Sequence, residues 1–396
     1  MKLHFADPTF SYELLRAASY GLYGGSEIGE VLATAKQIRE DDFESWHIAW
    51  YRTAASVEAI AQEALKEEHR VSAGQAFLRA SNYYRTAEFF LAPDDPRRPA
   101  TFEKSRTTFW QFLELSGLCA EQVRIPYEGT TLPGYFYRVD DSGLPRRTLL
   151  ALPGFDSTGE ELYFFAAAAA LQRGYNVLTF EGPGQGEPLR VQHIPARPDY
   201  EVPVRAALDY LLTRPEVDPD RIALMGTSLG GYYAPRAAAF EPRLKALIVH
   251  SAVFDLWATQ SKTKPALGFL VSKWKSPRVV ETILDVAMRF NSELRWSVKN
   301  AQWVFGASNP VEMIREIQRY SLKDIAGLVQ QPTLILHGAS DHLFPLDQAD
   351  MLYAALKAPK TLRVFTEEEG AEEHCQIGNI TLLHQVLFDW LDKTLS

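Results

Sequence analysis

The chain has 396 residues, of which 41 are Lys or Arg and 50 are Asp or Glu, so its formal net charge is −9. Hydrophobic residues make up 46% and charged residues 23%, proportions of a globular protein that exclude a largely disordered chain. The acidic balance argues against a nucleic-acid partner, because affinity for phosphates comes mainly from clustered Lys and Arg.

Cysteine content and apolar runs indicate the compartment. Cys119 and Cys375 are the two cysteines, too few for a disulfide framework or a cysteine-rich metal site. The first residues lack the apolar core of a secretory signal. No uncharged apolar run reaches the length of about 18 residues that a membrane helix needs. We therefore expect a cytoplasmic protein with neither a nucleic-acid nor a membrane partner.

Residues 1–120 are expected to form a helical, lid-like domain. Apolar residues recur there at three- and four-residue steps, the pattern of amphipathic helices, over about residues 28–38, 43–64, 72–91 and 102–113. Glycine, aspartate and proline clusters separate these stretches. No repeat of fixed period is present, so a helical appendage is expected rather than a repeat array.

Residues 121–396 show a different pattern, in which short apolar runs alternate with helical stretches. Val123–Tyr127 and Leu132–Tyr137 flank a turn and predict a hairpin. Further strands are expected at Thr148–Leu152, Asn176–Glu181, Arg221–Gly226, Ala246–His250, Thr333–His337 and Thr361–Phe365. Helices are expected at Glu160–Arg173, Val202–Thr213 and Leu229–Phe240. Such alternation predicts a doubly wound, mostly parallel sheet whose ligands bind beyond the C-terminal strand ends.

The alternation is interrupted over about residues 255–322. That stretch contains helix-like pieces rich in tryptophan and no strand of the same type. An insertion after a central strand would lie over the strand ends. Together with the N-terminal helices it would enclose a ligand site; the alternative is a simple extension of the core.

The segment Gly226-Thr227-Ser228-Leu229-Gly230 follows an apolar strand and precedes a helical run. This is G-x-S-x-G in the strand–turn–helix context that presents a nucleophilic serine on strained backbone. The helix N-terminus behind it supplies free N–H groups. Ser228 is therefore the predicted nucleophile, against the alternative of a structural turn.

A serine nucleophile needs a histidine base, itself oriented by an acid. With a serine in this kind of turn, the order along the chain is Ser, then Asp or Glu, then His. His250 and His337 end strands, where packing roles are expected, and His384 lies in an apolar-periodic helical run. His342 is beside the acid candidate. His374 lies in a loop between the last strand and the last helix, where the base must be, and it is the predicted base.

The acid that orients the base is predicted to be Asp341. It follows the strand Thr333–His337 through Gly338-Ala339-Ser340, which places its carboxylate at the C-terminal edge of the sheet. Asp255 and Asp285 compete, but both belong to the insertion. The ordinary interpretation of Asp341 is a turn or cap residue.

The oxyanion hole is expected to combine the N–H of Leu229 with an N–H from the loop after an earlier strand. The loop after Leu152 makes Phe155 the second donor, with Gly154 allowing close approach. Asp156 comes next. Near a developing negative charge it would act as an acid or base or orient a hydroxylated ligand. The alternative is an N-cap for a helix that starts near Thr158.

A second glycine-rich segment, Phe180–Glu187, follows another strand. It lacks the G-x-G-x-x-G spacing and the lysine of a phosphate-binding loop, so we expect a loop packed beside the nucleophile turn. No cluster of His, Cys and carboxylates has metal-ligand spacing, and no metal or other cofactor is expected.

Several of these segments resemble the α/β-hydrolase superfamily, over roughly residues 122–396. The branch that they resemble more narrowly carries an N-terminal helical domain and includes 2,6-dihydroxypseudooxynicotine hydrolase and the polyketide-shortening hydrolases of pigment pathways. The segments that carry the narrower resemblance are Ala80–Glu88, Pro153–Glu161, Glu181–Glu187, Gly226–Gly231 and His374–Asn379. The resemblance implies a doubly wound sheet with an N-terminal helical domain and a helical cap insertion, and a homodimer.

The resemblance also implies hydrolysis of a carbon–carbon bond next to a ketone, with an acidic residue just after the oxyanion loop. Asp156 matches that position. Pro153 stands where relatives often carry Gly, and Asp stands where Glu also occurs.

The sequence as a whole predicts a serine hydrolase with the triad Ser228, Asp341 and His374, acting on a small-molecule ketone such as a β-diketone, polyketide-like or aryl-ketone compound. The alternatives are a carboxylesterase, a thioesterase or a peptidase, or an acyltransferase or lactone-forming enzyme with the same triad. A peptidase usually has a large N-terminal propeller or an acidic amine-binding pair, and the N-terminal helices do not supply the propeller. A non-catalytic binding protein is a further alternative that the apparent triad argues against. Two or three of six aromatic residues are expected to line an aromatic, partly apolar pocket, and the others to be core: Tyr20, Tyr23, Trp46, Tyr83, Trp257 and Trp274.

Overall fold

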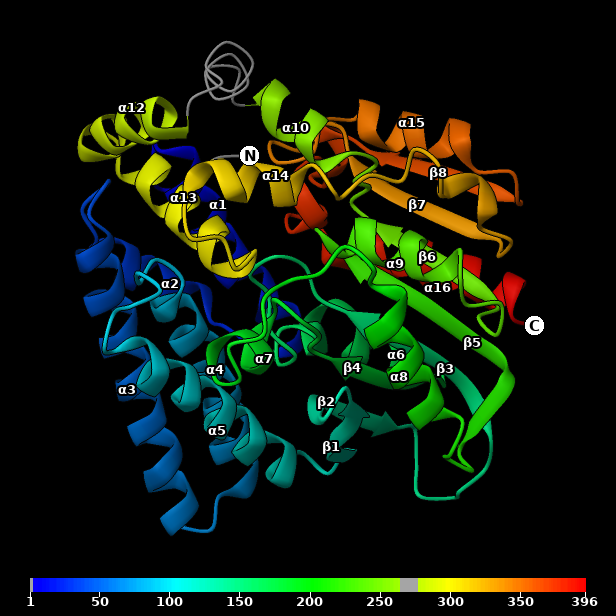
Figure 1. Ribbon diagram of the computed structural model, residues 1–396. Coiled ribbons are helices and arrows are strands. Elements are labelled where there is room, and N and C mark those ends of the chain that lie inside the picture. The colour runs from blue at the N-terminus through cyan, green and yellow to red at the C-terminus, as the bar shows by residue number, and fades with distance from the viewer. Residues whose placement is uncertain (1–2, 264–276) are drawn as a thin grey trace. The chain divides into compact units, whose positions relative to one another are not determined.

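The computed structural model describes residues 3–263 and 277–396 (Figure 1). The chain divides into two compact units. The first comprises Met1–Ala120 with Asn291–Asn300, and the second comprises Glu121–Phe290 with Ala301–Ser396. A short stretch of the insertion thus belongs to the first unit.

The first unit is built from helices. Their bounds are α1 (Pro8–Ser19), α2 (Ile28–Ala35), α3 (Phe43–Lys66), α4 (Arg70–Glu88) and α5 (Arg98–Ser116). The four helices that the periodicity predicts are present, and α1 precedes them. Helix starts follow local chemistry: the side chains of Asp7 and Asp42 accept the N–H groups of Phe10 and Ser45 at 2.8 and 3.0 Å.

Aromatic side chains form the core of this unit. Trp46, Trp50 and Tyr83 are fully buried where α3 packs on α4. The indole of Trp46 donates to the carbonyl of Thr86 at 2.8 Å, so its polar edge is satisfied within the core. Trp296, from the insertion segment, donates to the carbonyl of Phe89 at 3.1 Å, and its ring packs at a tilt against that of Phe89 with centroids 4.9 Å apart. This contact explains why Asn291–Asn300 belongs to the helical unit.

The second unit is an eight-stranded sheet. Its strands are β1 (Cys119–Tyr127), β2 (Thr130–Arg138), β3 (Arg146–Leu152), β4 (Asn176–Phe180), β5 (Val217–Thr227), β6 (Ala246–His250), β7 (Thr333–Gly338) and β8 (Lys360–Phe365). The spatial order is β1-β2-β4-β3-β5-β6-β7-β8. β2 pairs antiparallel with β4, and the pairs from β4 to β8 are parallel. The predicted α/β fold with a mostly parallel sheet is confirmed.

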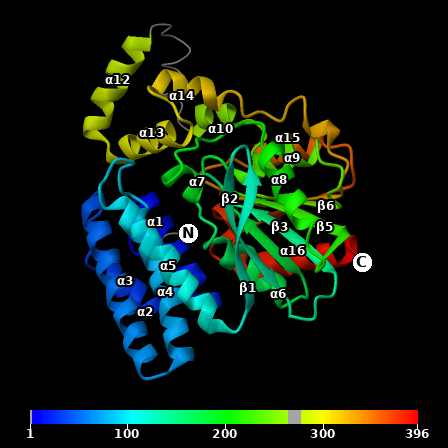
Figure 2. The same ribbon diagram turned by 60° about the horizontal axis from the view of Figure 1, so that its bottom comes forward.

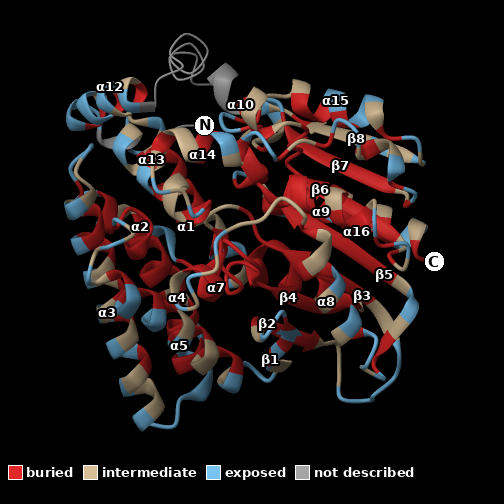
Figure 3. Cartoon of the chain, in the orientation of Figure 1, coloured by how far each residue is buried: buried red, intermediate tan, exposed pale blue. Residues whose placement is uncertain are grey.

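Helices cover both faces of this sheet. Their bounds are α6 (Ala168–Leu171), preceded by a π-helical turn (Tyr163–Ala167), α7 (Gly186–Arg190), α8 (Glu201–Leu211), α9 (Gly230–Ala238), α15 (Asp347–Ala355) and α16 (Ile380–Thr394). α8 and α9 lie on one face and α16 on the other (Figure 2). The strands β4, β6 and β7 are therefore buried at every position, as their unbroken apolar runs predict (Figure 3).

The insertion follows β6 and is helical where it is described. Its helices are α10 (Leu256–Thr263), α12 (Pro277–Phe290), α13 (Ser292–Val304) and α14 (Pro310–Ile317). A single bridge between Asp255 and Ser321 closes its base. Trp274, one of the expected pocket aromatics, lies outside the described residues. Among the helices of the described part of the chain, none is long and apolar enough to cross a membrane.

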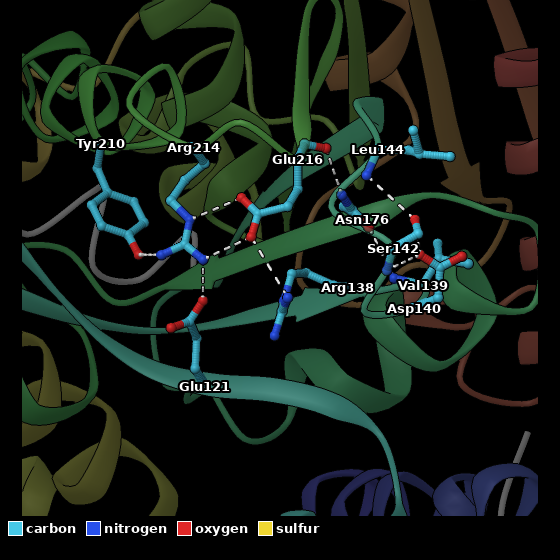
Figure 4. Close-up of polar contacts among 10 residues, drawn as sticks. All are labelled: Glu121, Arg138, Val139, Asp140, Ser142, Leu144, Asn176, Tyr210, Arg214 and Glu216. Atoms are coloured by element: carbon cyan, nitrogen blue, oxygen red, sulfur yellow. Dashed lines mark hydrogen bonds and ion pairs between the residues drawn. The ribbon is translucent and has the colours of Figure 1, made fainter.

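A cluster of charged and polar side chains connects the hairpin β1–β2 to the segment that precedes β5 (Figure 4). The guanidinium of Arg214 contacts Glu216 at 3.2 Å and Glu121 at 2.5 Å, and it donates to the hydroxyl of Tyr210 at 3.3 Å. Arg138 approaches Glu216 at 3.6 Å. These contacts join β1 and β2 to the segment between α8 and β5, so the hairpin is held to the parallel part of the sheet by charge as well as by backbone pairing.

Asn176 in the same cluster provides a stability test. Its buried amide accepts the N–H of Val139 at 2.9 Å and donates to the carbonyl of Glu216 at 2.8 Å. We expect Asn176→Leu to lower the free energy of unfolding by about 2 kcal/mol, because two backbone groups lose their partners. Urea denaturation measures the effect, and the exposed Ser142→Ala is the control, expected to change stability by less than about 0.5 kcal/mol. Equal losses of unfolding free energy in both variants would contradict a stabilising role for the hydrogen bonds of Asn176.

Candidate active site

Ser228 stands at the sharp turn between β5 and α9. Its φ of 59° is in the left-handed region, which a residue with a side chain rarely adopts. The turn is held because the N–H of Ser228 donates to the carbonyl of His250 at 2.9 Å, and the N–H of Gly231 donates to the carbonyl of Ser228 at 2.7 Å. The G-x-S-x-G segment thus adopts the strained strand–turn–helix geometry that its sequence predicts.

Two glycines allow neighbouring backbone to approach this turn. A Cβ on Gly226 would lie 2.1 Å from the carbonyl oxygen of Gly230, so only glycine fits there. A Cβ on Gly154 would lie 2.6 Å from Cβ of Ser228 and 3.0 Å from the backbone nitrogen of Leu229. The loop after β3 is therefore in close contact with the serine turn.

Three sequence-predicted side chains form one hydrogen-bonded chain. Nε2 of His374 lies 2.9 Å from Oγ of Ser228, and Nδ1 of His374 lies 2.7 Å from Oδ2 of Asp341. A carboxylate only accepts, so Nδ1 carries a hydrogen and donates it to Asp341. Nε2 of the neutral ring is then the acceptor, and the hydroxyl of Ser228 donates to it. This arrangement is the one in which a histidine can take a proton from a serine.

Asp341 is buried but well provided with donors. Its Oδ1 accepts the N–H groups of Leu343 and Phe344 at 3.0 and 2.8 Å, and its Oδ2 faces His374. Burial alone would raise the pKa of Asp341, but the charge and hydrogen bond of His374 lower it to about 2. Asp341 is therefore ionised at neutral pH.

The same pair sets the basicity of His374. Burial alone would lower the pKa of the imidazole, but the Asp341 carboxylate outweighs burial and raises that pKa well above its usual 6.5. The ring of Phe344 packs edge-on against the imidazole with centroids 5.1 Å apart, which restricts its rotation.

The remaining candidates do not belong to this hydrogen-bonded chain. Asp255 caps α10 by accepting the N–H of Ala258 at 2.8 Å, and Asp285 is exposed on α12. His384 is buried in α16 and contacts the carbonyl of Phe165 at 2.9 Å. His250 is buried at the end of β6, where desolvation lowers its pKa to about 3.

Two residues at strand ends hold the loops that carry Asp341 and His374; a packing role was expected for one of them, His337, and none was assigned to Ser251. His337, at the end of β7, accepts the N–H of Ala252 at 3.1 Å and contacts the carbonyl of Phe344 at 2.8 Å. Ser251, directly after β6, accepts the N–H of Cys375 at 3.3 Å through its hydroxyl. Cys375 has a φ of 55°, so this bond holds a strained turn next to His374. The sequence feature that could have singled out His337 and Ser251 is their position at the ends of strands.

The two expected oxyanion donors are close to each other. Leu229 follows Ser228 at the start of α9, and Phe155 belongs to the loop that contacts it. In the part of the chain that the structure describes, neither backbone N–H donates to a protein acceptor. The ring of Phe155 packs 5.8 Å from that of Phe305, so the end of the insertion reaches this loop.

Asp156 follows Phe155 and is half-buried. The helix expected near Thr158 instead begins with a π-helical turn at Tyr163, flanked by Leu162. The interpretation of Asp156 as the N-cap of that helix is therefore wrong, because the N-cap position is occupied by Leu162. The polar residues after it bond among themselves, with the hydroxyl of Ser157 donating to Glu161 at 2.6 Å.

The aromatic side chains that were expected to line a pocket from the helical unit belong mainly to the core of that unit. Tyr20, Trp46 and Tyr83 are fully buried, and the hydroxyl of Tyr83 donates to Glu30 at 2.6 Å. Trp257 lies half-buried on α10. No cluster of three or more metal-ligating side chains occurs within residues 3–263 and 277–396.

Comparison with known proteins identifies the class. Residues 143–368 match the family described as "Serine aminopeptidase, S33". The chain belongs to this family of α/β-hydrolases and is an enzyme of that class, which confirms the resemblance seen in its motifs.

Relatives extend over almost the whole chain. The hydrolase LUC6 of Fusarium sp is 38% identical, covering 99% of this chain and 98% of that protein. The 20-hydroxy-prefusarin hydrolase FUS2 of Gibberella moniliformis is 36% identical over the same shares. The crystal structure of 2,6-dihydroxy-pseudo-oxynicotine hydrolase has the same fold, with a TM-score of 0.75, 24% identity, and coverage of 96% of this chain and 95% of that one. The helical unit is thus part of a shared architecture.

The coupling of Asp341 and His374 is measurable directly. We expect the imidazole of His374 to titrate above 6.5, and Asp341→Asn to bring its pKa below that value, because burial then acts without the opposing charge. Nitrogen NMR of labelled histidine measures both. His250 and His384, whose pKa values desolvation lowers to about 3 and about 4, serve as internal references that stay neutral. An unchanged His374 titration in the variant would contradict the coupling.

Proposed function

We propose that this enzyme is a serine hydrolase that cleaves a carbon–carbon bond next to a ketone, with Ser228, His374 and Asp341 as its catalytic triad. The observation that carries the proposal is the hydrogen-bonded chain from Ser228 Oγ through His374 to Asp341, with 2.9 and 2.7 Å between the bonded atoms. The strained φ of Ser228 supports the role of nucleophile, since it presents Oγ at the tip of the turn.

In the proposed mechanism His374 takes the proton of Ser228 as Oγ attacks the ketone carbon. Asp341, ionised at neutral pH, stabilises the imidazolium that forms. The N–H groups of Leu229 and Phe155 hold the oxyanion, which needs preorganised donors with no competing acceptor.

Collapse of the tetrahedral adduct then breaks the carbon–carbon bond. Its electron pair passes to the α-carbon of the leaving group, where a neighbouring carbonyl stabilises it as an enolate, and the proton returns from His374. Water, deprotonated by His374, hydrolyses the acyl-enzyme. The products are a carboxylic acid and a shorter ketone. Because Ser228, His374 and water supply the nucleophiles and the protons, the reaction needs no cofactor.

We assign Asp156 the task of assisting protonation or orientation of the leaving group. It directly follows the oxyanion donor Phe155, and its alternative role as a helix cap is removed by the late start of the helix. Plain ester hydrolysis gives no reason for a carboxylate beside a developing negative charge. Cleavage of a carbon–carbon bond does give a reason for this carboxylate, because the leaving group must be protonated at carbon.

The relatives come from fungi, and they support a polyketide-like substrate. One is named a 20-hydroxy-prefusarin hydrolase, and it covers nearly the whole of this chain. The fold shared with 2,6-dihydroxy-pseudo-oxynicotine hydrolase supports the same branch of the superfamily. The same triad would also hydrolyse esters or thioesters or transfer the acyl group to a hydroxyl, so a test of the function needs ester substrates beside ketones.

The nucleophile is tested with Ser228→Ala against 1,3-diketones, aryl ketones and simple esters. We expect turnover by the variant to fall by about 10⁴-fold or more, since removal of a triad member has effects of that size. Product analysis measures it, with the exposed Ser142→Ala as control. Undiminished turnover by the Ser228 variant would reject the triad. Cleavage of esters with every diketone intact would reject the carbon–carbon assignment alone.

The role of Asp156 is tested with Asp156→Asn, which keeps the shape and removes the charge. We expect kcat on diketones to fall by about 10²-fold, the usual size of a general acid–base contribution, while ester hydrolysis stays at the wild-type rate. Parallel kinetics on the two substrate classes measure this, with the melting temperature as a control for folding. Equal losses on both classes would show that Asp156 has no specific part in carbon–carbon cleavage.

A further inference from the structure

The glycine-rich segment after β4 holds a buried glutamine with no assigned role. Gln185 is only 1% exposed, and it lies immediately before α7. Its Oε1 accepts the N–H of Gly182 at 2.9 Å. Its Nε2 donates to the carbonyl of Pro153 at 2.7 Å and to that of Gly154 at 3.1 Å. The amide therefore joins this segment to the loop after β3.

These three bonds also determine which way round the amide lies. An amide oxygen accepts and an amide nitrogen donates, so Oε1 must face the N–H of Gly182 and Nε2 must face the two carbonyls. Both donor hydrogens of Nε2 have an acceptor, and the group is shielded from water. Such a satisfied buried amide rigidifies the backbone that it contacts.

The carbonyl of Gly154 and the N–H of Phe155 belong to one peptide unit. That unit is trans, since the described chain has no cis peptide bond. In a trans peptide the C=O and the N–H point in opposite directions. With the carbonyl of Gly154 bonded to Gln185, the N–H of Phe155 must point away from the glycine-rich segment.

A carboxylate makes a second connection between the same two segments. Oε1 of Glu181 accepts the N–H of Gly159 at 2.7 Å, and Oε2 accepts the N–H of Glu187 at 2.8 Å. Gln185 thus holds the start of the loop after β3, and Glu181 holds its end. Gln185 holds the peptide between Gly154 and Phe155 directly, and Glu181 holds the other end of the loop that carries it.

We propose that Gln185 is a positioning residue that orients the N–H of Phe155 as an oxyanion donor. The inference rests on the proposed function, because it assumes that Ser228 attacks a carbonyl whose oxygen these N–H groups receive. Gln185 itself does not touch the substrate. It acts through the peptide that it holds, on the transition state rather than on substrate binding.

The size of the effect follows from that role. Removing one oxyanion donor usually lowers kcat by about 10²–10³-fold. A free peptide would still present its N–H part of the time, so we expect a loss of about 10²-fold in kcat for a variant without the amide donor. KM is expected to stay close to the wild-type value, because ground-state binding does not depend on this donor.

Two variants and one matched control test the proposal. Gln185→Glu keeps an oxygen for the N–H of Gly182 and removes the donor, and Gln185→Met removes both at nearly the same volume. Gln192→Met is the control: this half-buried amide, a few residues along, donates to the carbonyl of Thr131 at 3.0 Å and belongs to no contact with the loop after β3. Rates are expressed per serine titratable with a fluorophosphonate, so that an unfolded fraction cannot lower them.

Three measurements are made on each protein, at mildly alkaline pH with a substrate that the wild type turns over. We expect both Gln185 variants to lose about 10²-fold in kcat and to bind an aryl trifluoromethyl ketone, whose adduct carries the oxyanion, more weakly by a similar factor. The pH midpoint of kcat/KM should stay in place, because the bonds between His374 and Asp341 are untouched. Gln192→Met should behave as the wild type.

Other outcomes would overturn the proposal. These are wild-type kcat in both Gln185 variants, a loss of kcat with unchanged affinity for the trifluoromethyl ketone, a loss confined to KM, or an equal loss in Gln192→Met. Ser228→Ala, assayed in parallel, separates this failure from failure of the proposed function. If that variant stays active the triad itself is rejected, and if it is inactive while the Gln185 variants are unimpaired only the positioning role is rejected.

Discussion

Three parallel strands of the sheet, β5, β7 and β8, end at one edge, and each member of the Ser–His–Asp chain follows one of those ends. Ser228 follows β5, Asp341 follows β7 and His374 follows β8. Adjacent parallel strands are only about 4.8 Å apart, so the neighbouring ends of β7 and β8 bring Asp341 and His374 within bonding distance. Ser228 follows the more distant β5, and the loop after β8 carries His374 to it. β6 lies between β5 and β7, and its end supplies Ser251, which holds the turn next to His374. The site is a consequence of strand order.

Burial gives this edge its chemistry. A carboxylate without water is costly unless donors surround it, and Asp341 has two backbone N–H groups and an imidazole. The cost of desolvation is offset by the same contact that makes His374 a stronger base. A serine held at positive φ adds local strain, which the surrounding hydrogen bonds maintain. Stability and reactivity here depend on one network.

The loop after β3 shows how a second strand end is adapted to the first. It approaches Ser228 closely because Gly154 has no side chain, and its peptides are held from behind by Gln185 and Glu181. The bonds of Gln185 and Glu181 are buried, so water does not compete for these backbone groups. The insertion after β6 reaches the same loop through Phe305. Three segments distant in sequence therefore meet at this loop.

The sequence by itself determined the features that depend on local sterics and periodicity. The serine turn follows from glycines at fixed spacing, and the alternation of apolar runs with helices predicts the parallel sheet whose edge carries Asp341 and His374. Long-range contacts decided the rest. The helix after Asp156 starts late because the intervening residues bond elsewhere, and Trp296 joins a piece of the insertion to the helical unit. Gln185 had no recognisable signal, because its role depends on carbonyls more than thirty residues earlier in the chain, which only the folded sheet brings beside it.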